Sequence, residues 1–190
     1  LPPEKSKSSP TSQTRAFLYW KLRPSRASRA KSATLSFLKG RSADEMLDVA
    51  RAFFRDEYLP RFYQDGLTEL WSLRSQGMKL VVVSASPDVY MRALPEFMPL
   101  DAVLSTRCEV GGDGRYTGQV GENCKGEEKV RRIKQYLKEN GFVLDMKCSS
   151  AYGDSPSDAD MMALVNRAVL VNPKKALLRR RPDGIVVHWT

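Results

Sequence analysis

The stretch Tyr152-Gly-Asp-Ser-Pro-Ser-Asp158 directly follows a short run of residues with the pattern of a buried strand. It places two carboxylates, Asp154 and Asp158, four residues apart where the strand gives way to a helix, so both can face one crevice. In open α/β sheets ligands bind at this edge of the sheet, and two hard oxygen ligands there suit Mg²⁺ and a phosphate. The alternative is that Asp154 caps the helix and Asp158 complements the helix dipole.

Strands and helices alternate through most of the chain. The apolar run from Lys79 to Ser84 has the composition of a strand covered on both faces, which is typical of parallel sheets. Ser42 and Glu45 form a capping box before a helix that ends near Pro60. The alternation predicts βαβ units and a parallel sheet. Further predicted strands cover 102–105, 108–110, 115–120, 149–153, 168–171 and 185–189, and further helices cover 66–76, 87–97, 125–138, 157–165 and 174–180.

Composition excludes several kinds of protein. The one histidine, His188, lies next to the end of the chain, so catalysis that needs a well-placed imidazole is not expected. The three cysteines form no CxxC pair, which indicates reduced thiols and a cytoplasmic protein. The apolar runs are too short to span a bilayer.

The net charge of +9 is confined to the first fifth of the chain. Residues 1–41 hold ten Lys and Arg against one acid, Glu4, whereas the remainder holds 21 basic and 21 acidic residues. A basic segment of this kind is a nucleic-acid arm, a membrane contact or a solvated tail. Its aromatics form no recognisable RNA motif, so nucleic acid is not favoured as a partner.

Three chemical groups arise in order at predicted strand ends or helix starts: the Ser84 hydroxyl, the ammonium groups of Lys125 and Lys129, and the carboxylates of Asp154 and Asp158. Hydroxyl and backbone N–H groups at a helix start can hold phosphate oxygens, and a lysine adds positive charge. One sheet edge can therefore gather a phosphate-handling site. Each part alone also has an ordinary structural explanation, as a turn serine or a solvated lysine.

This ordered set resembles the haloacid dehalogenase (HAD) superfamily of phosphatases, in its phosphoserine-phosphatase-like branch. The run Val81-Val-Val-Ser-Ala-Ser-Pro87 is similar to the second motif of that family, and Asn123-Cys-Lys-Gly-Glu-Glu-Lys-Val130 to the third. The fourth is matched by the stretch that contains Asp154 and Asp158. The resemblance covers residues 41–190 and, more weakly, 16–40.

The resemblance implies a role for each candidate residue. Ser84, with the backbone of Ala85, would bind the substrate phosphate, and Asp154 would bind Mg²⁺ while Asp158 supports the site. The site lysine is Lys125, which lies nearest the helix start, or Lys129, which shares its helix face. The implied fold is α/β, with a Rossmann-like parallel sheet and a helical cap. It divides the chain into a disordered basic tail at 1–15, a partial cap at 16–65 and a core at 66–190.

The chain departs from the family at the first motif, a strand that ends Asp-x-Asp-x-Thr and supplies the aspartyl nucleophile. The one Asp-x-Asp here is Asp158-Ala-Asp160, inside the fourth motif. We therefore expect the first central strand to be missing from this chain and the chain alone to be inactive. The parent would be a Mg²⁺-dependent phosphomonoesterase acting through an aspartyl phosphate on a small phosphate ester, such as phosphoserine or a lipid headgroup phosphate. The alternative is a non-catalytic remnant that binds anions or nucleic acid.

Overall fold

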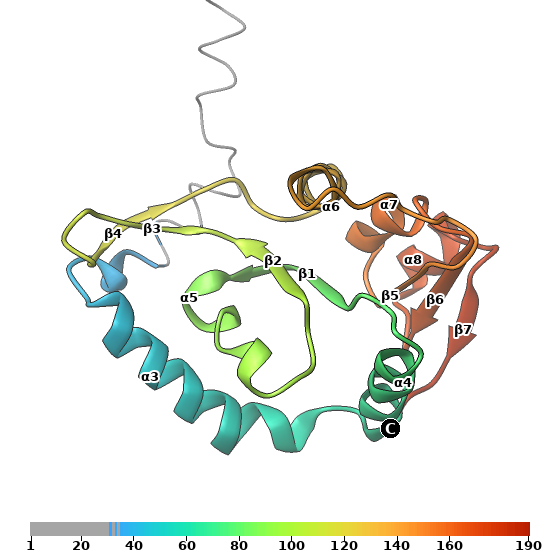
Figure 1. Cartoon of the computed structure of the whole chain (residues 1–190), viewed down its shortest axis with the longest axis horizontal. Helices are drawn as coiled ribbons and strands as arrows, with labels where there is room; N and C mark the ends of the chain where they lie inside the picture. The colour runs from blue at the N-terminus through green and yellow to red at the C-terminus, as the bar shows by residue number, and fades with distance from the viewer. Residues whose placement is uncertain (1–30, 32, 34) are drawn as a thin grey trace, which may run out of the picture.

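The computed structural model describes residues 31, 33 and 35–190 and has an α/β fold with parallel strands (Figure 1). The predicted tail at residues 1–15 lies outside these residues. The described part of residues 1–41 contains one 3-10 helix, η1 (Ser36–Leu38).

The parallel strands form two separate sheets in the described part of the chain. β1 pairs with β2 in register from Val81 opposite Ala102, and β5 pairs with β6, which pairs with β7. The prediction of parallel pairing is confirmed, but the strands do not join into one sheet, and β1 and β5 each lie at a sheet edge. The strands are β1 (Val81–Pro87), β2 (Ala102–Thr106), β5 (Ser150–Gly153), β6 (Arg167–Val171) and β7 (Ile185–Val187).

Most predicted helices are present. Ser42 caps α3, where its side chain accepts a hydrogen bond from the backbone N–H of Glu45 at 3.4 Å, and the helical segment ends in a 3-10 turn at Pro60 as predicted. The helices are α3 (Ala43–Phe53), the π-helical turn η2 (Phe54–Tyr58), η3 (Leu59–Arg61), α4 (Gln64–Ser75), α6 (Glu127–Glu139) and α8 (Lys175–Arg180).

Two predicted helices are shorter than expected. The predicted helix 87–97 is a single turn, α5 (Asp88–Met91), followed by the 3-10 turn η4 (Leu94–Glu96), because Pro95 has no N–H to continue the α-helical ladder. The predicted helix 157–165 begins as the 3-10 turn η5 (Pro156–Asp158) and continues as α7 (Ala159–Met162). After α7 the N–H of Leu164 bonds to the carbonyl of Met161, which tightens and ends the helix.

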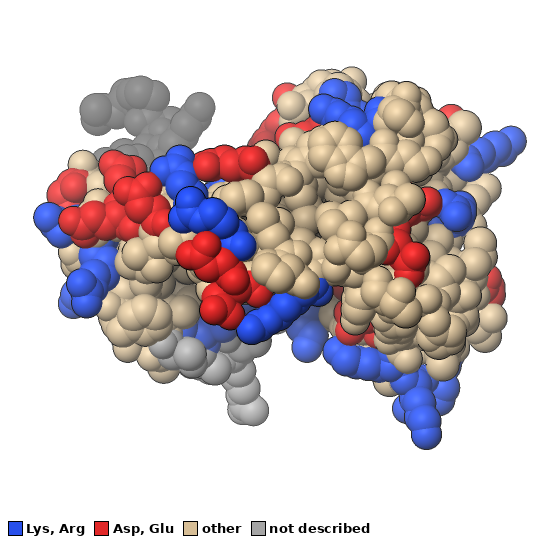
Figure 2. All heavy atoms as spheres, turned by 90° about the horizontal axis from the view of Figure 1, so that it is seen from below, with Lys and Arg blue, Asp and Glu red and all other residues tan. Residues whose placement is uncertain are grey.

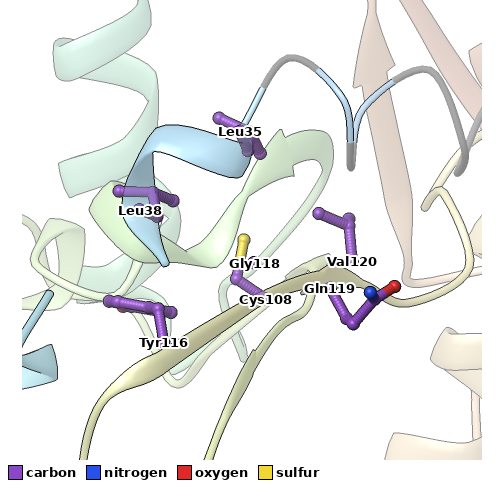
Figure 3. Close-up of a pocket in the computed structure, with 7 residues that line it drawn as sticks. All are labelled: Leu35, Leu38, Cys108, Tyr116, Gly118, Gln119 and Val120. Carbon is purple, nitrogen blue, oxygen red and sulfur yellow. The ribbon is translucent and has the colours of Figure 1, made fainter. Parts of the chain in front are cut away.

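The predicted strands 108–110 and 115–120 are confirmed, pair antiparallel as a hairpin and pack against η1. Figure 3 shows Leu35 and Leu38 above the hairpin residues Cys108, Tyr116 and Val120. These side chains leave no room for a water molecule, so the contact is part of the core and is not a ligand pocket. The hairpin strands are β3 (Cys108–Val110) and β4 (Tyr116–Val120).

A second apolar cluster joins α3 to α5 and η4. Phe54 is fully buried at its centre, and its ring lies 5.9 Å from that of Phe97. Because Phe54 and Ala50 share this cluster with Met91 and Leu94, the segment predicted as a cap packs directly on residues predicted as core. A third cluster, around Leu170 and Met162, lies under the β5–β6–β7 sheet.

The surface of the described residues mixes both signs of charge. Figure 2 shows one face, on which acidic and basic side chains adjoin on one half and a broad area without charged residues covers much of the other. All three cysteines are free thiols, with Cys108 and Cys124 buried and Cys148 exposed. Within the described residues, none of the helices has the length and apolar character needed to cross a bilayer.

We expect Phe54→Ala to lower the free energy of unfolding by about 3–5 kcal/mol, because it leaves a cavity at a fully buried position. Phe37→Ala is the matched control, since Phe37 is 66% exposed, and should change stability by less than about 0.5 kcal/mol. Urea unfolding followed by circular dichroism measures both. Equal effects of the two substitutions would contradict the packing described for α3.

Candidate active site

Lys129 connects the two sheets through a buried ion pair. Its ammonium group donates to Asp158 Oδ1 at 2.6 Å and to the backbone carbonyl of Val83 on β1 at 2.8 Å. The two charged side chains are only 8% and 7% exposed. Lys129 lies in the first turn of α6, so one helix start joins β1 to the segment that follows β5.

Asp158 is fixed by its own turn as well as by Lys129. Its second oxygen, Oδ2, accepts a hydrogen bond from the Ser155 backbone N–H at 3.0 Å, and Ser155 caps the following turn in return. Gly153 makes this approach possible, because a Cβ at that position would lie 2.8 Å from the Cβ of Asp158. The glycine, serine and second aspartate of the Tyr152–Asp158 stretch therefore form one compact unit.

Asp154 has different surroundings. Its side chain is 55% exposed and pairs with Lys174 at 3.0 Å, while its backbone carbonyl accepts from the Lys174 N–H at 3.0 Å. Asp154 and Asp158, predicted to face one crevice, thus have separate partners. Among the residues that the structure describes, no three His, Cys, Asp or Glu side chains gather as a ready-made metal site.

Ser84 and Ala85 lie near the carboxyl end of β1, where the register with β2 shifts. The Ser84 hydroxyl accepts a hydrogen bond from the Ser86 N–H at 3.1 Å. The carbonyl of Ala85 accepts from the buried hydroxyl of Thr106 at 2.8 Å and from the ammonium of Lys31. Ser84 therefore retains its hydroxyl proton for a ligand, whereas the Ala85 carbonyl is held by the protein.

The two candidate lysines differ in their exposure to solvent. Lys129 is buried, whereas Lys125 is exposed and lines an open pocket of about 440 Å³. Arg180 in the same pocket pairs with Asp160 at 2.7 Å. The structure therefore places Lys129, and not Lys125, against Asp158. The pocket is lined by Glu122, Asn123, Lys125, Gly126, Pro156, Ser157 and Arg180.

Sequence reasoning missed Lys31. Its ammonium group donates to Asn123 Oδ1 at 2.5 Å, to Thr106 Oγ1 at 3.3 Å and to the Ala85 carbonyl. Burial lowers the pKa of this lysine below its usual value. No local signal distinguishes Lys31 from the other basic residues of its segment, because all three acceptors are more than 50 residues away in the sequence.

The chain belongs to the haloacid dehalogenase-like hydrolase family, whose model matches residues 4–163. It is 31% identical over 137 residues to the protein CicA of Caulobacter vibrioides, an alignment that covers 71% of this chain and 59% of CicA. It is 30% identical to the phosphoserine phosphatase SerB1 of Mycobacterium tuberculosis over 75% of this chain and 46% of SerB1. The chain thus spans less than two thirds of the length of either relative.

A solved structure agrees with the fold. A Bordetella pertussis protein of unknown function matches with a TM-score of 0.77 at 23% identity, over 92% of this chain and 79% of that chain. At this level of identity the match supports the α/β HAD-like fold. The resemblance found in the sequence motifs is therefore confirmed at the level of the family.

We expect Lys129→Met to lower the free energy of unfolding by about 3–5 kcal/mol, because it leaves the Asp158 carboxylate buried without its counter-charge. The double variant Lys129→Met/Asp158→Leu should recover a large part of that loss, since it removes both charges. Lys125→Met serves as the control and should have little effect, because Lys125 is exposed. Denaturant unfolding measures all three, and a Lys129→Met variant as stable as the control would contradict the ion pair.

Proposed function

We propose that this chain carries the phosphate-binding groups of a Mg²⁺-dependent phosphomonoester hydrolase of the HAD type. The observation that carries the proposal is the state of Lys129. A lysine has three N–H donors, and two of them are engaged by Val83 and Asp158. The third has no acceptor among the described residues, so it is available for a phosphate oxygen on an ammonium group whose position is already fixed.

The other groups of the site would act with Lys129. Ser84, near the end of β1, would donate its hydroxyl proton to the same phosphate. Asp158 would orient the ammonium group through their contact at 2.6 Å. These groups bind and polarise a phosphate, but none of them is placed to attack phosphorus.

Asp154 fits a Mg²⁺ ligand by its chemistry. It is an exposed carboxylate whose one ion pair, with Lys174, is also exposed and therefore weak. Mg²⁺ is commonly bound by one or two carboxylates, with waters and substrate phosphate completing the shell. The metal would supply positive charge that stabilises the transferring phosphoryl group. Asp154 would hold it, and Lys174 would have to give up its contact.

We further propose that the nucleophile belongs to a strand outside these 190 residues. The family resemblance places an Asp-x-Asp-x-Thr strand at the centre of the sheet, and β1 and β5 are both sheet edges in the described part of the chain. A strand between them would pair with both. Its final aspartate would then reach the edge where Ser84 and Lys129 lie, and would form the aspartyl phosphate.

The substrate class follows from the same groups. One hydroxyl, one ammonium and one metal-binding carboxylate suit a small phosphate monoester, and the relative SerB1 is named a phosphoserine phosphatase. A lipid headgroup phosphate remains a second candidate within this class. The division of the chain into a cap at 16–65 and a core at 66–190 also belongs to the proposal.

Calorimetric titration with inorganic phosphate tests the binding site. The chain should bind phosphate in the presence of Mg²⁺, and Asp154→Asn should abolish the Mg²⁺ dependence, because it removes the carboxylate charge. Asp48→Asn is the control, since Asp48 is an exposed carboxylate on α3. Absence of phosphate binding under all conditions would refute the proposal.

Complementation tests the missing nucleophile. The chain alone should not hydrolyse p-nitrophenyl phosphate. Adding a peptide with an apolar strand that ends Asp-x-Asp-x-Thr should produce Mg²⁺-dependent hydrolysis, and the same peptide with its first Asp changed to Asn should not. If the chain alone were active and Asp154→Asn abolished the activity, the nucleophile would lie within these residues. Phosphate binding without turnover in any combination would favour the non-catalytic alternative.

A further inference from the structure

Lys31, Asn123 and Lys125 lie together beside the proposed phosphate site. Lys31 reaches across from the segment before η1, and its ammonium contacts the amide oxygen of Asn123 at 2.5 Å. Asn123 and Lys125 both line the open pocket of about 440 Å³. The Ala85 carbonyl, which directly follows Ser84, is another partner of Lys31, so this group adjoins the phosphate-binding end of β1.

Two lysines of this group lie near one another and near a further cation, although Glu122 lines the same pocket. The charges of Lys125 and Arg132 act on Lys31. Arg132 is paired with Glu128 at 2.8 Å. Neither Lys31 nor Lys125 forms an ion pair with any carboxylate in the part of the chain that the structure describes.

The partners that Lys31 does have are neutral. A hydroxyl, a carbonyl and an amide oxygen satisfy its hydrogen bonds but do not balance its charge. A partly desolvated cation gains more from an anion than from an uncharged acceptor, because the anion adds a Coulomb attraction that is stronger at a low local dielectric. An anion at the pocket can therefore take the place of the Asn123 oxygen on Lys31.

We propose that Lys31, Asn123 and Lys125 form a second anion subsite, which binds a carboxylate or a second phosphate of the phosphorylated substrate. This inference rests on the proposed function, because the first phosphate is assigned to Ser84 and Lys129. It narrows the substrate class to phosphate monoesters that carry another anionic group. The pocket beyond Asn123 holds the remainder of such a substrate.

Two stable probes separate the subsites: methylphosphonate, which offers one anionic group, and phosphonoacetate, which adds a carboxylate. Calorimetric titration of the chain in Mg²⁺ should give a dissociation constant roughly tenfold lower for phosphonoacetate, the advantage expected of one added ion pair at a partly desolvated cation. Lys31→Met and Lys125→Met should each remove most of that advantage without changing methylphosphonate binding. Lys134→Met is the matched control, since it removes an exposed lysine from the same helix as Lys129.

The outcomes distinguish the two proposals. If neither probe binds, both the proposed function and the proposed second subsite are wrong. If both probes bind equally, or if Lys134→Met lowers the preference as much as Lys125→Met does, the second subsite is wrong while the phosphate site stands. Lys125→Met decides the matter even if Lys31→Met fails to fold, because the Lys125 side chain is exposed.

Discussion

The buried contact of Lys129 with Asp158 and Val83 is the constraint on which the candidate site depends. A buried ion pair is not in itself a source of stability, because desolvation of both charges offsets their attraction. Here the pair is supported by a carbonyl on one side and a backbone N–H on the other, so neither charge lacks a partner. The main effect of the ion pair is to position other residues of the site. Lys129 fixes the carboxyl end of β1 relative to the turn after β5. Ser84 directly follows Val83 of β1, and Asp154 directly follows Gly153 of β5, so the same contact positions both candidate residues.

A second set of contacts joins the two sheets on the opposite side, through α4. Leu67 and Leu70 of α4 pack on the same apolar cluster as Val82 of β1, and α4 also contacts β5 and β6. The hydroxyl of Tyr152 on β5 donates to Glu69 on α4, and Arg167 on β6 donates to the same hydroxyl at 2.9 Å. Burial and the Glu69 contact raise the pKa of Tyr152 to about 12, so the phenol stays protonated and keeps donating. Figure 1 shows α6 on one side of the molecule and α4 on the other, with the two sheets between them. The relative position of the sheets is thus held at both sides although β1 and β5 are not paired with each other.

The sequence predicted most of what depends on neighbouring residues. Apolar runs located the parallel strands, and Ser42 located the start of α3. Prediction failed where distant parts of the chain decide the outcome. Lys125 and Lys129 were predicted to share a helix face, but Lys125 lies before α6, and the packing of α6 against β1 and η5 buries Lys129. Lys31 could not be identified at all, because its acceptors belong to β1, β2 and the loop before α6.

The distribution of charged residues explains why the net charge of the chain says little about its ligand. Residues 42–190 hold equal numbers of basic and acidic residues, and Figure 2 shows both signs side by side on one face. Selection of an anion therefore depends on the few cations whose charge the fold leaves unbalanced. Lys129 is neutralised by Asp158, so it positions a phosphate more than it attracts one. Lys31 and Lys125 form no ion pair with the described carboxylates. Because Lys31 is partly buried, its charge is screened less by solvent than the exposed, paired charges elsewhere.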